Sequence, residues 1–303
     1  MVGRITNQMA SQMTLAGIES ALDRLDTTQQ ELSTGKSINQ PSDNPSGTAL
    51  ALGLNTDLSN LTSYSNNVTD ATGWATAQSA AMTDITNCVQ RIRSLTVEAA
   101  NGNESAGDMQ NAAQEVNQLI DQIKQDANTQ YNGQYVFSGS ATSTEPYPSG
   151  SDTYAGNSGT VTRTIGPNTS LTVSANLSGV LGNGQSAGDG QLLDTLRTIS
   201  SDMQSGSSSA VSSDLSSLDT NLNSLGGLSA NIGAVQDRLQ MASSRIQTLQ
   251  LSDTQVLSNT QDADMASTEI SFSTQQAALQ AALQAGASIV QQSLMNFLGS
   301  SSG

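Results

Sequence analysis

The sequence predicts a mainly α-helical protein: a long antiparallel helical bundle or coiled-coil rod formed by both chain termini, with a small β-rich central insertion. Near both ends of the 303-residue chain, apolar residues recur at alternating spacings of three and four, the pattern of a coiled-coil seam. The centre is instead rich in Gly, Ser, Thr, Asn and Pro. Hydrophobic residues make up only 35% of the chain, against roughly 45–50% in globular proteins, so much of the helical surface is polar.

The first predicted helix ends at Gly35, a residue type that commonly terminates helices. Its seam has one polar position, Gln29, and the apolar positions are Leu15, Ile18, Leu22, Leu25 and Leu32. The following residues 39–47 cannot be helical throughout, because they contain two prolines among Asn, Ser, Asp and Gly. We interpret this segment as an inter-domain turn whose key positions are Gly35, Asn39, Pro41, Asp43, Pro45 and Gly47.

Helical periodicity then returns in three stretches. One starts near Thr48, a longer one runs from about Thr76 to Ala100, and the third contains Val116, Leu119, Ile120 and Ile123. The turn signal Asn101-Gly102-Asn103 separates the second from the third. Asn132-Gly133 is the favoured dipeptide of a tight hairpin turn, and residues 134–138 after it predict a short strand.

The central segment contains two short β-prone runs, residues 161–165 and 171–173, and a glycine-rich stretch at 179–190 that we expect to be flexible. Three domains are predicted from these changes in composition. Residues 1–45 with 258–303 form a terminal coiled-coil assembly domain. Residues 46–138 with 191–257 form an α-helical rod domain, and residues 139–190 form a β-rich outer insertion.

Helical periodicity resumes at Leu192 and is interrupted at Ser-rich residues 206–209. A heptad follows, with Asp253 as its polar exception, at Val235, Leu239, Ala242, Ile246, Leu249 and Val256. A final helix precedes an unstructured tail at 299–303. The two terminal helices can pair, and a second apolar edge on them needs a neighbouring molecule to be buried. The predicted assembly interface is therefore Leu15, Ile18, Leu22, Leu25, Leu32, Leu279, Leu283, Val290, Leu294, Phe297 and Leu298.

Composition argues against catalysis, cofactors and nucleic acids. The chain has no histidine, which removes His-dependent catalytic triads and His-ligated zinc, and its one cysteine, Cys88, lies on an apolar helix face as a small core residue. A formal net charge of −16 disfavours binding to phosphate backbones. We expect no secretory signal peptide and no membrane span, because long apolar runs are missing.

Local motifs support no other chemistry. Residues 34–37, Thr-Gly-Lys-Ser, resemble the end of a phosphate-binding loop, but the required earlier glycine is Gln30 and no strand precedes it. A glycine-rich match at 182–187 lacks a surrounding βαβ repeat. Asp262 and Asp264 are interpreted as a solvated or helix-capping pair. The basic stretch Arg91–Arg93 is interpreted as an exposed helix face that pairs with acids such as Glu98.

Several segments together resemble the flagellin superfamily. Residues 4–7 and 32–47 are similar to its N-terminal signature "LSSGKRIN…DDPAG", although Ser37 and Gln40 stand where basic residues are usual. Residues 90–102 resemble "QRIRELAVQAANG", and residues 273–283 resemble the C-terminal region. Within the superfamily, Asn132–Gly139 looks more like the "NGRYLFSG" of the hook-associated protein 3 family, which forms the hook–filament junction, than like a filament flagellin. Filament flagellin is the alternative.

The resemblance implies a non-enzymatic structural subunit of the bacterial flagellum, an adaptor between hook-associated protein and filament. It implies an extracellular location, reached by flagellar type III export without a cleaved signal peptide. Implied partners are the first hook-associated protein, flagellin, a cytoplasmic export chaperone and further copies in a helical ring. It also implies termini that fold on assembly. By similarity, Arg91, Leu95 and Glu115 match a flagellin surface that an innate immune receptor recognises.

Overall fold

The computed structural model describes residues 7–300, with side chains at positions 9, 12–288 and 291. Contacts between Cα atoms divide the chain into two compact units. Unit 1 comprises residues 1–59 and 250–303, and unit 2 comprises residues 60–249. The helices are α1 (Asn7–Thr34), α2 (Pro45–Ala100), α3 (Ala106–Ala127), α4 (Ser178–Leu181), α5 (Leu192–Gln204), α6 (Ser208–Gln261) and α7 (Met265–Ser300). The prediction of a mainly α protein with a small β-rich insertion is confirmed. The three-domain division stays a prediction.

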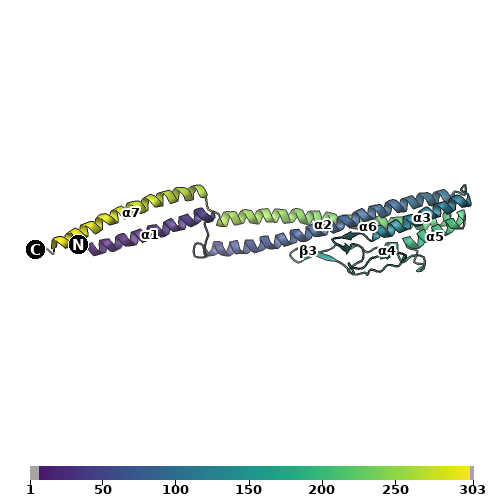
Figure 1. Cartoon of the computed structure of the whole chain (residues 1–303), viewed down its shortest axis with the longest axis horizontal. Helices are drawn as coiled ribbons and strands as arrows, with labels where there is room; N and C mark the ends of the chain where they lie inside the picture. Colours follow the sequence, from purple (N-terminus) through teal and green to yellow (C-terminus); the bar gives the residue numbers. More distant parts are fainter. Residues whose placement is uncertain (1–6, 301–303) are drawn as a thin grey trace. The chain divides into compact units, whose positions relative to one another are not determined.

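Unit 1 contains the antiparallel pair α1–α7, whose Cα atoms come within 8 Å of each other (Figure 1). Thr28 of α1 donates a hydrogen bond to the Gln275 side chain at 2.7 Å, and Ile18 lies against Gly286 further along the pair. The predicted pairing of the two ends is therefore present. The helix α7 reaches Ser300, beyond the predicted start of the tail at Gly299, and residues 301–303 lie outside the described part.

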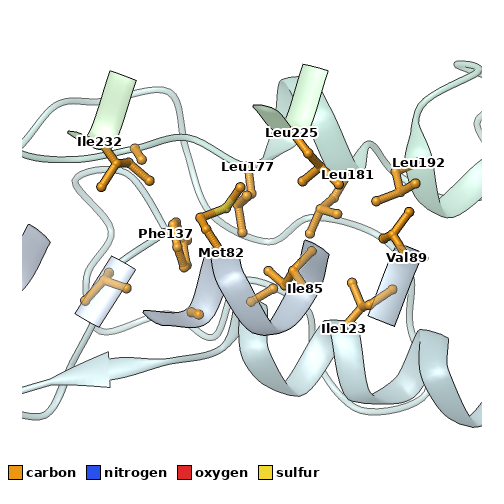
Figure 2. Packing of buried hydrophobic residues seen from close by; sticks show 14 of the residues in the cluster. Met82, Ile85, Val89, Ile123, Phe137, Leu177, Leu181, Leu192, Leu225 and Ile232 are labelled. Carbon is orange, nitrogen blue, oxygen red and sulfur yellow. The ribbon is translucent and has the colours of Figure 1, made fainter. Parts of the chain in front are cut away.

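Unit 2 is built on apolar rows spaced by seven residues on two long helices. On α2 the row is Leu61, Val68, Ala75, Met82 and Val89, and on α6 it is Val211, Leu218, Leu225, Ile232, Leu239 and Ile246. All of these side chains are buried in one cluster, part of which is drawn in Figure 2. The heptad predicted for α6 is confirmed in part: Leu239 and Ile246 are buried and Val235 and Ala242 pack against the cluster, but Leu249 and Val256 are 38% and 41% exposed. The buried row begins earlier than predicted, at Val211.

The helix α2 is one continuous helix where periodicity predicted two separate stretches. Its glycine at position 73 is needed for packing, because a Cβ there would collide with the ring and hydroxyl of Tyr131. That ring meets Trp74 edge-on, with centroids 6.4 Å apart. The space left by the missing side chain, here called the notch at Gly73, therefore holds Tyr131 of the hairpin that follows α3. This packing offsets the weaker helix propensity of glycine.

That hairpin pairs β1 (Gln130–Tyr131) with β2 (Gln134–Tyr135). Its turn residues Asn132 and Gly133 both have positive φ, as the predicted tight turn requires. The predicted strand is shorter than expected. After Tyr135 the chain leaves the ladder, and Val136 and Phe137 become fully buried in the core of unit 2.

The central segment contains a second hairpin of β3 (Thr162–Gly166) and β4 (Thr169–Thr172), which confirms the two β-prone runs. Arg163 connects this hairpin to α2 through an ion pair with Asp70, at 2.8 Å between Nε and Oδ2. The stretch 179–190 was predicted to be flexible, yet it includes part of α4 and buries Leu181 completely. Figure 2 shows Leu177 and Leu181 beside Met82 and Leu225, so the segment completes the helical core.

The described residues were also expected to form no membrane span and no metal site. None of the helices described here is both long and apolar enough to cross a membrane. Over the same residues, no group of three or more His, Cys, Asp or Glu side chains is arranged to hold a metal ion. Cys88 is half-buried at the edge of the core, and burial raises the pKa of its thiol.

We predict that Gly73→Ala destabilises unit 2, whereas Gly227→Ala on α6 stabilises it. An alanine methyl at position 73 must displace the Tyr131 ring, an overpacking that costs about 1–3 kcal/mol. In the described part of the chain no atom lies within 4 Å of a Cβ at Gly227, so that exchange gains the helix propensity of alanine, about 1 kcal/mol. Urea denaturation followed by circular dichroism measures both. Equal effects of the two variants on the free energy of unfolding would contradict a role for the notch at Gly73 in seating Tyr131.

We also predict that Asp214→Asn stabilises the protein at neutral pH. Burial and the nearby Asp202 raise the pKa of Asp214 to about 6, from an ordinary value of 3.8, and among the described residues none forms a hydrogen bond with its buried Oδ2. A raised pKa means that the stability contributed by the protonated carboxyl is present below pH 4 and is lost as the pH rises through 6. An amide mimics the protonated form at every pH.

The gain at pH 7.5 should be about 1 kcal/mol after allowance for solvent screening, or a few degrees in unfolding temperature, and it should shrink at pH 4. Thermal melts at both pH values measure it. Asp237→Asn, at an exposed position of the same helix, is the matched control and should change little. An equal gain for Asp214→Asn at both pH values would argue against a charge effect.

Candidate assembly interface

The turn after α1 is held by backbone geometry and by one carboxylate. Gly35 has a φ of 70° and ends α1 as predicted. The Asp43 Oδ2 atom accepts hydrogen bonds from the backbone nitrogens of Asn39 and Gln40, both at 2.9 Å. The backbone N–H groups of Gln40 and Asn39 hold the pKa of Asp43 below its ordinary value. Pro41 is exposed in the middle of this turn.

The end of the turn starts α2. Asn44 caps the helix, accepting a hydrogen bond from the Gly47 nitrogen at 2.9 Å, and Pro45 occupies the first helical position, where its missing N–H costs nothing. Gly47 is required because a Cβ there would lie 2.6 Å from the Ile38 side chain. The whole turn lies within unit 1, although the sequence analysis interpreted it as inter-domain.

The same turn is joined to the connection between α6 and α7. The Ser37 nitrogen donates to the Gln261 carbonyl at 2.7 Å, and the Ala263 nitrogen donates to the Gly35 carbonyl at 2.9 Å. Asp264 caps α7 through its Oδ1, which accepts from the Ala266 nitrogen at 3.1 Å, so its predicted capping role is confirmed. These bonds fix where α1 and α7 start to run together.

The seam between α1 and α7 combines small side chains with larger apolar ones. Its shielded positions alternate by three and four residues along each helix. They are Thr14, Ile18, Ala21, Leu25, Thr28 and Leu32 on α1, and Thr268, Phe272, Gln275, Leu279, Ala282 and Gly286 on α7. A Cβ at Gly286 would lie 3.2 Å from Ile18, so the glycine lets the backbones approach. Ile18, Leu25, Leu32 and Leu279 of the predicted interface thus lie in this internal seam.

The other predicted interface leucines lie outside the seam. Leu15, Leu22 and Leu283 are 58%, 48% and 51% exposed. Heptad spacing predicts Leu15 and Leu22 in the seam, but Thr14 and Ala21 occupy those positions, because small side chains allow closer packing of the two helices. Leu15 and Leu22 are seven residues apart and share a face of α1. The side chains of Val290, Leu294, Phe297 and Leu298 lie outside the described residues.

The surface of α7 lacks charged side chains over most of its length, a property that heptad spacing does not reveal. From Ile270 to Gly303 the sequence has no Asp, Glu, Lys or Arg. Ile270 itself is 69% exposed, and the exposed positions further along include Ala277, Ala278, Ala281 and Ala285. A count of charges along the sequence would have found this stretch. A solvent-exposed helix usually carries charges on its outer face, so this surface is unusually well suited to packing against another helix.

The predicted receptor-facing residues are brought together at a cleft of about 260 Å³ between α2 and α3. Arg91 and Glu115 pair at 2.7 Å between Nε and Oε1, and both are well exposed. Leu95 is only 6% exposed, so it lies in the floor of the cleft. Arg93 pairs with Asp219 of α6. The ion pairs of Arg91 and Arg93 are thus with acids on other helices, and not with Glu98 as predicted. Recognition by a receptor stays a prediction.

Comparison with protein families finds two matches. The bacterial flagellin N-terminal helical region matches residues 5–142, and the bacterial flagellin C-terminal helical region matches residues 215–298. The chain is 33% identical to flagellin 1 of Proteus mirabilis over 136 residues, which are 45% of this chain and 37% of that flagellin. It is 31% identical to a flagellin of Salmonella dublin over 135 residues, or 44% and 27% of the two chains. The match thus spans about a third of the length of these curated relatives.

Solved structures of flagellar hook-associated chains share the fold. A chain described as a flagellar hook-associated protein of Vibrio parahaemolyticus superposes with a TM-score of 0.66, at 19% identity, over 73% of this chain and 100% of that chain. FlgL of Bacillus cereus gives 0.60 at 19% identity over 68% and 99% of the two chains. Hook-associated protein 3 of Legionella pneumophila gives 0.58 at 14% identity over 68% and 97%. With flagellin-type helical regions at both ends and a fold shared with these hook-associated chains, the protein belongs to the flagellin superfamily.

Proposed function

We propose that this protein is a structural, non-enzymatic subunit of the bacterial flagellum that joins a hook-associated protein to the flagellin filament through its terminal helices. The observation that carries the proposal is the unpaired surface of α1 and α7. The α1–α7 seam uses one face of each helix and leaves Leu15, Leu22 and Leu283 exposed. These leucines and the uncharged surface of α7 are apolar or neutral area that neighbouring subunits would bury.

The energetics favour packing that depends on neighbours. Thr, Ala, Gln and Gly, which bury little apolar area, occupy seven of the twelve seam positions named above. Ordering the helices costs about 1–2 kcal/mol per residue in backbone entropy, while each fully buried leucine contributes roughly 1.5–3 kcal/mol. Burial of the half-exposed Leu15, Leu22 and Leu283 by adjacent subunits would add stabilisation that the isolated helix pair lacks, in line with termini that fold on assembly.

The proposed arrangement is a helical ring of copies outside the cell. Contacts between different faces of successive subunits extend an assembly along an axis, which suits a junction between two tubes. The partners are then the first hook-associated protein on one side and flagellin on the other, with a cytoplasmic chaperone covering the terminal helices before export. The fold shared with hook-associated chains supports this junction role over the alternative, a filament flagellin.

We predict that the double variant Leu15→Asp with Leu22→Asp no longer joins flagellar structures, although it stays folded. Both side chains are exposed in the isolated chain, so charges there cost little until a neighbour packs against them. Circular dichroism checks the fold, and co-sedimentation with isolated hook–filament fragments measures incorporation. We expect at least a tenfold loss, equivalent to about 1.4 kcal/mol.

Thr27→Asp is the control, because it adds a charge to an exposed position on a different face of α1. It should incorporate like the unmodified protein. Normal incorporation of the double leucine variant would remove Leu15 and Leu22 from the interface and with them the main support for the proposal.

We predict that the purified protein alone does not lengthen short filament fragments, because a junction subunit caps one structure and starts another. Electron microscopy of fragments incubated with an excess of the protein measures this. A second sample with added flagellin should show elongation. Long filaments grown from this protein alone would establish the alternative, a filament flagellin.

A further inference from the structure

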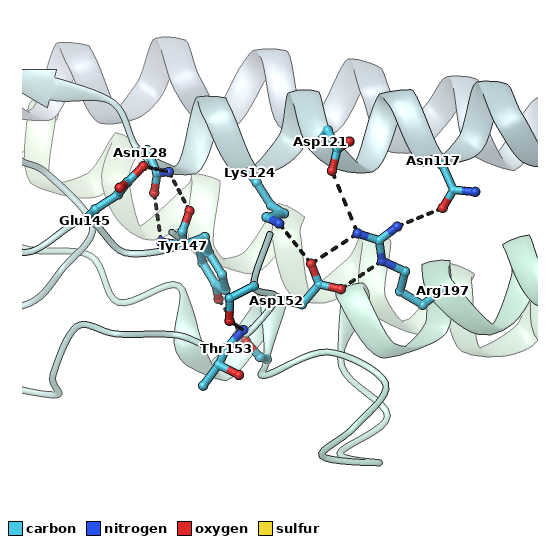
Figure 3. Close-up of polar contacts among 11 residues, drawn as sticks. Asn117, Asp121, Lys124, Asn128, Glu145, Tyr147, Asp152, Thr153 and Arg197 are labelled. Carbon is cyan, nitrogen blue, oxygen red and sulfur yellow. Dashed lines mark hydrogen bonds and ion pairs between the residues drawn. The ribbon is translucent and has the colours of Figure 1, made fainter. Parts of the chain in front are cut away.

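A polar cavity of about 830 Å³ in unit 2 has no part in the proposed assembly role. Its walls are α3, α5 and the two loops at 145–153 and 183–186 of the central segment (Figure 3). The loops approach each other closely, since a Cβ at Gly184 would lie 2.5 Å from the Asp152 side chain. The cavity is thus formed where the central segment closes over the helices.

An ion cluster fixes the wall of this cavity. The Asp152 carboxylate accepts hydrogen bonds from Lys124 Nζ at 3.0 Å and from Arg197 Nε and Nη2 at 2.8 and 3.2 Å. Arg197 also donates to Asn117 at 2.7 Å. Although burial opposes ionisation, the hydrogen bonds from Arg197 and Lys124 hold the pKa of Asp152 below its ordinary value. Asp152 is therefore ionised at neutral pH, and the cluster joins three chain segments.

Lys124 has more donors than partners. Its side chain is only 7% exposed, and its ammonium carries three N–H donors. Among the described residues, Asp152 is the partner that the structure gives to this group. A buried ammonium needs acceptors for its remaining donors, and the cavity that Lys124 lines is where a ligand can provide them.

The rest of the cavity lining includes neutral side chains that can donate and accept hydrogen bonds. Within the described part of the chain, no protein group is hydrogen-bonded to the side chains of four lining residues: Gln125, Ser149, Gln185 and Ser186. Glu145 uses one oxygen to accept from Asn128 at 2.8 Å, and Asp121 is 3.8 Å from Arg197. Amides and hydroxyls both donate and accept, so a ligand rich in hydroxyl groups matches this wall.

Other ligand classes fit less well. The lining has almost no apolar side chains, and its one aromatic ring, Tyr147, is 1% exposed, so neither a lipid chain nor a stacked base finds a surface. The lining carboxylates Asp121, Glu145 and Asp152 outnumber Lys124 and Arg197, which disfavours an anion, while the unused donors of the Lys124 ammonium disfavour a cation. These charges leave a neutral and strongly polar molecule.

We propose that this cavity binds a neutral polyhydroxylated molecule, a short saccharide, through hydrogen bonds from Lys124, Gln125 and Gln185. Without a stacking ring the affinity rests on hydrogen bonds, and a dissociation constant of about 1 mM is expected. The residues that line the site lie outside the terminal helices, so a binding experiment tests this proposal separately from the assembly role.

Saturation-transfer NMR on the full chain tests this with three neutral probes, glucose, N-acetylglucosamine and maltotriose, and with glucuronic acid as an anionic probe. We expect transfer to at least one neutral probe. Gln125→Ala combined with Gln185→Ala should weaken it about tenfold or more, because two hydrogen-bonding groups are lost while the ion cluster remains. Gln118→Ala, at another exposed position of α3 outside the cavity, is the matched control and should bind normally.

Three results would overturn the proposal. They are no transfer to any neutral probe, transfer that the double variant leaves unchanged, and preferential binding of glucuronic acid. Circular dichroism of each variant ensures that a loss of binding is not a loss of fold.

Discussion

The repeat of apolar side chains every seven residues along α2 and α6 is the constraint on which unit 2 depends. Helices of 56 and 54 residues gain little stability from local propensity, so their persistence relies on this continuous buried row. Every other element of the unit packs onto it. Helices α3 and α5 add a second layer, with Ile120, Ile123, Leu196 and Ile199 fully buried, and the hairpin after α3 is seated in the notch at Gly73.

The central segment belongs to that core as much as the helices do. Its Leu177 and Leu181 are fully buried beside side chains of α2 and α6, and Ile165, Leu171 and Val173 join the same cluster. The ion pairs of Arg163 with Asp70 and of Arg197 with Asp152 add directional bonds between the segment and the helices. A segment with so much Gly and Ser thus acquires a defined conformation from its contacts with a rigid partner.

The helices were predictable because helical periodicity is a local signal: Leu239 and Ile246 are seven residues apart, and both are buried as predicted. The α1 seam was less predictable. Hydropathy favours Leu15 and Leu22 over Thr14 and Ala21, whereas close approach of two backbones favours the small residues. The Lys124–Asp152 and Arg197–Asp152 bonds join residues 28 and 45 positions apart, with no local signal in the sequence. Burial of Leu181 likewise depends on tertiary contacts within a stretch whose composition indicates a loop.

The uncharged stretch of α7 has a consequence for the environments in which its contacts hold. Dissolved salt weakens attraction and repulsion between exposed charges, with a screening length of about 8 Å at physiological ionic strength and about 3 Å at 1 M. From Ile270 onward α7 carries no charged side chains, so its packing depends on dispersion, burial of apolar surface and hydrogen bonds between neutral groups, such as that of Thr28 with Gln275. Contacts made by this helix should therefore keep nearly the same strength in fresh water and in brine, whereas those made by the acidic side chains of α1, such as Glu19 and Asp23, should vary.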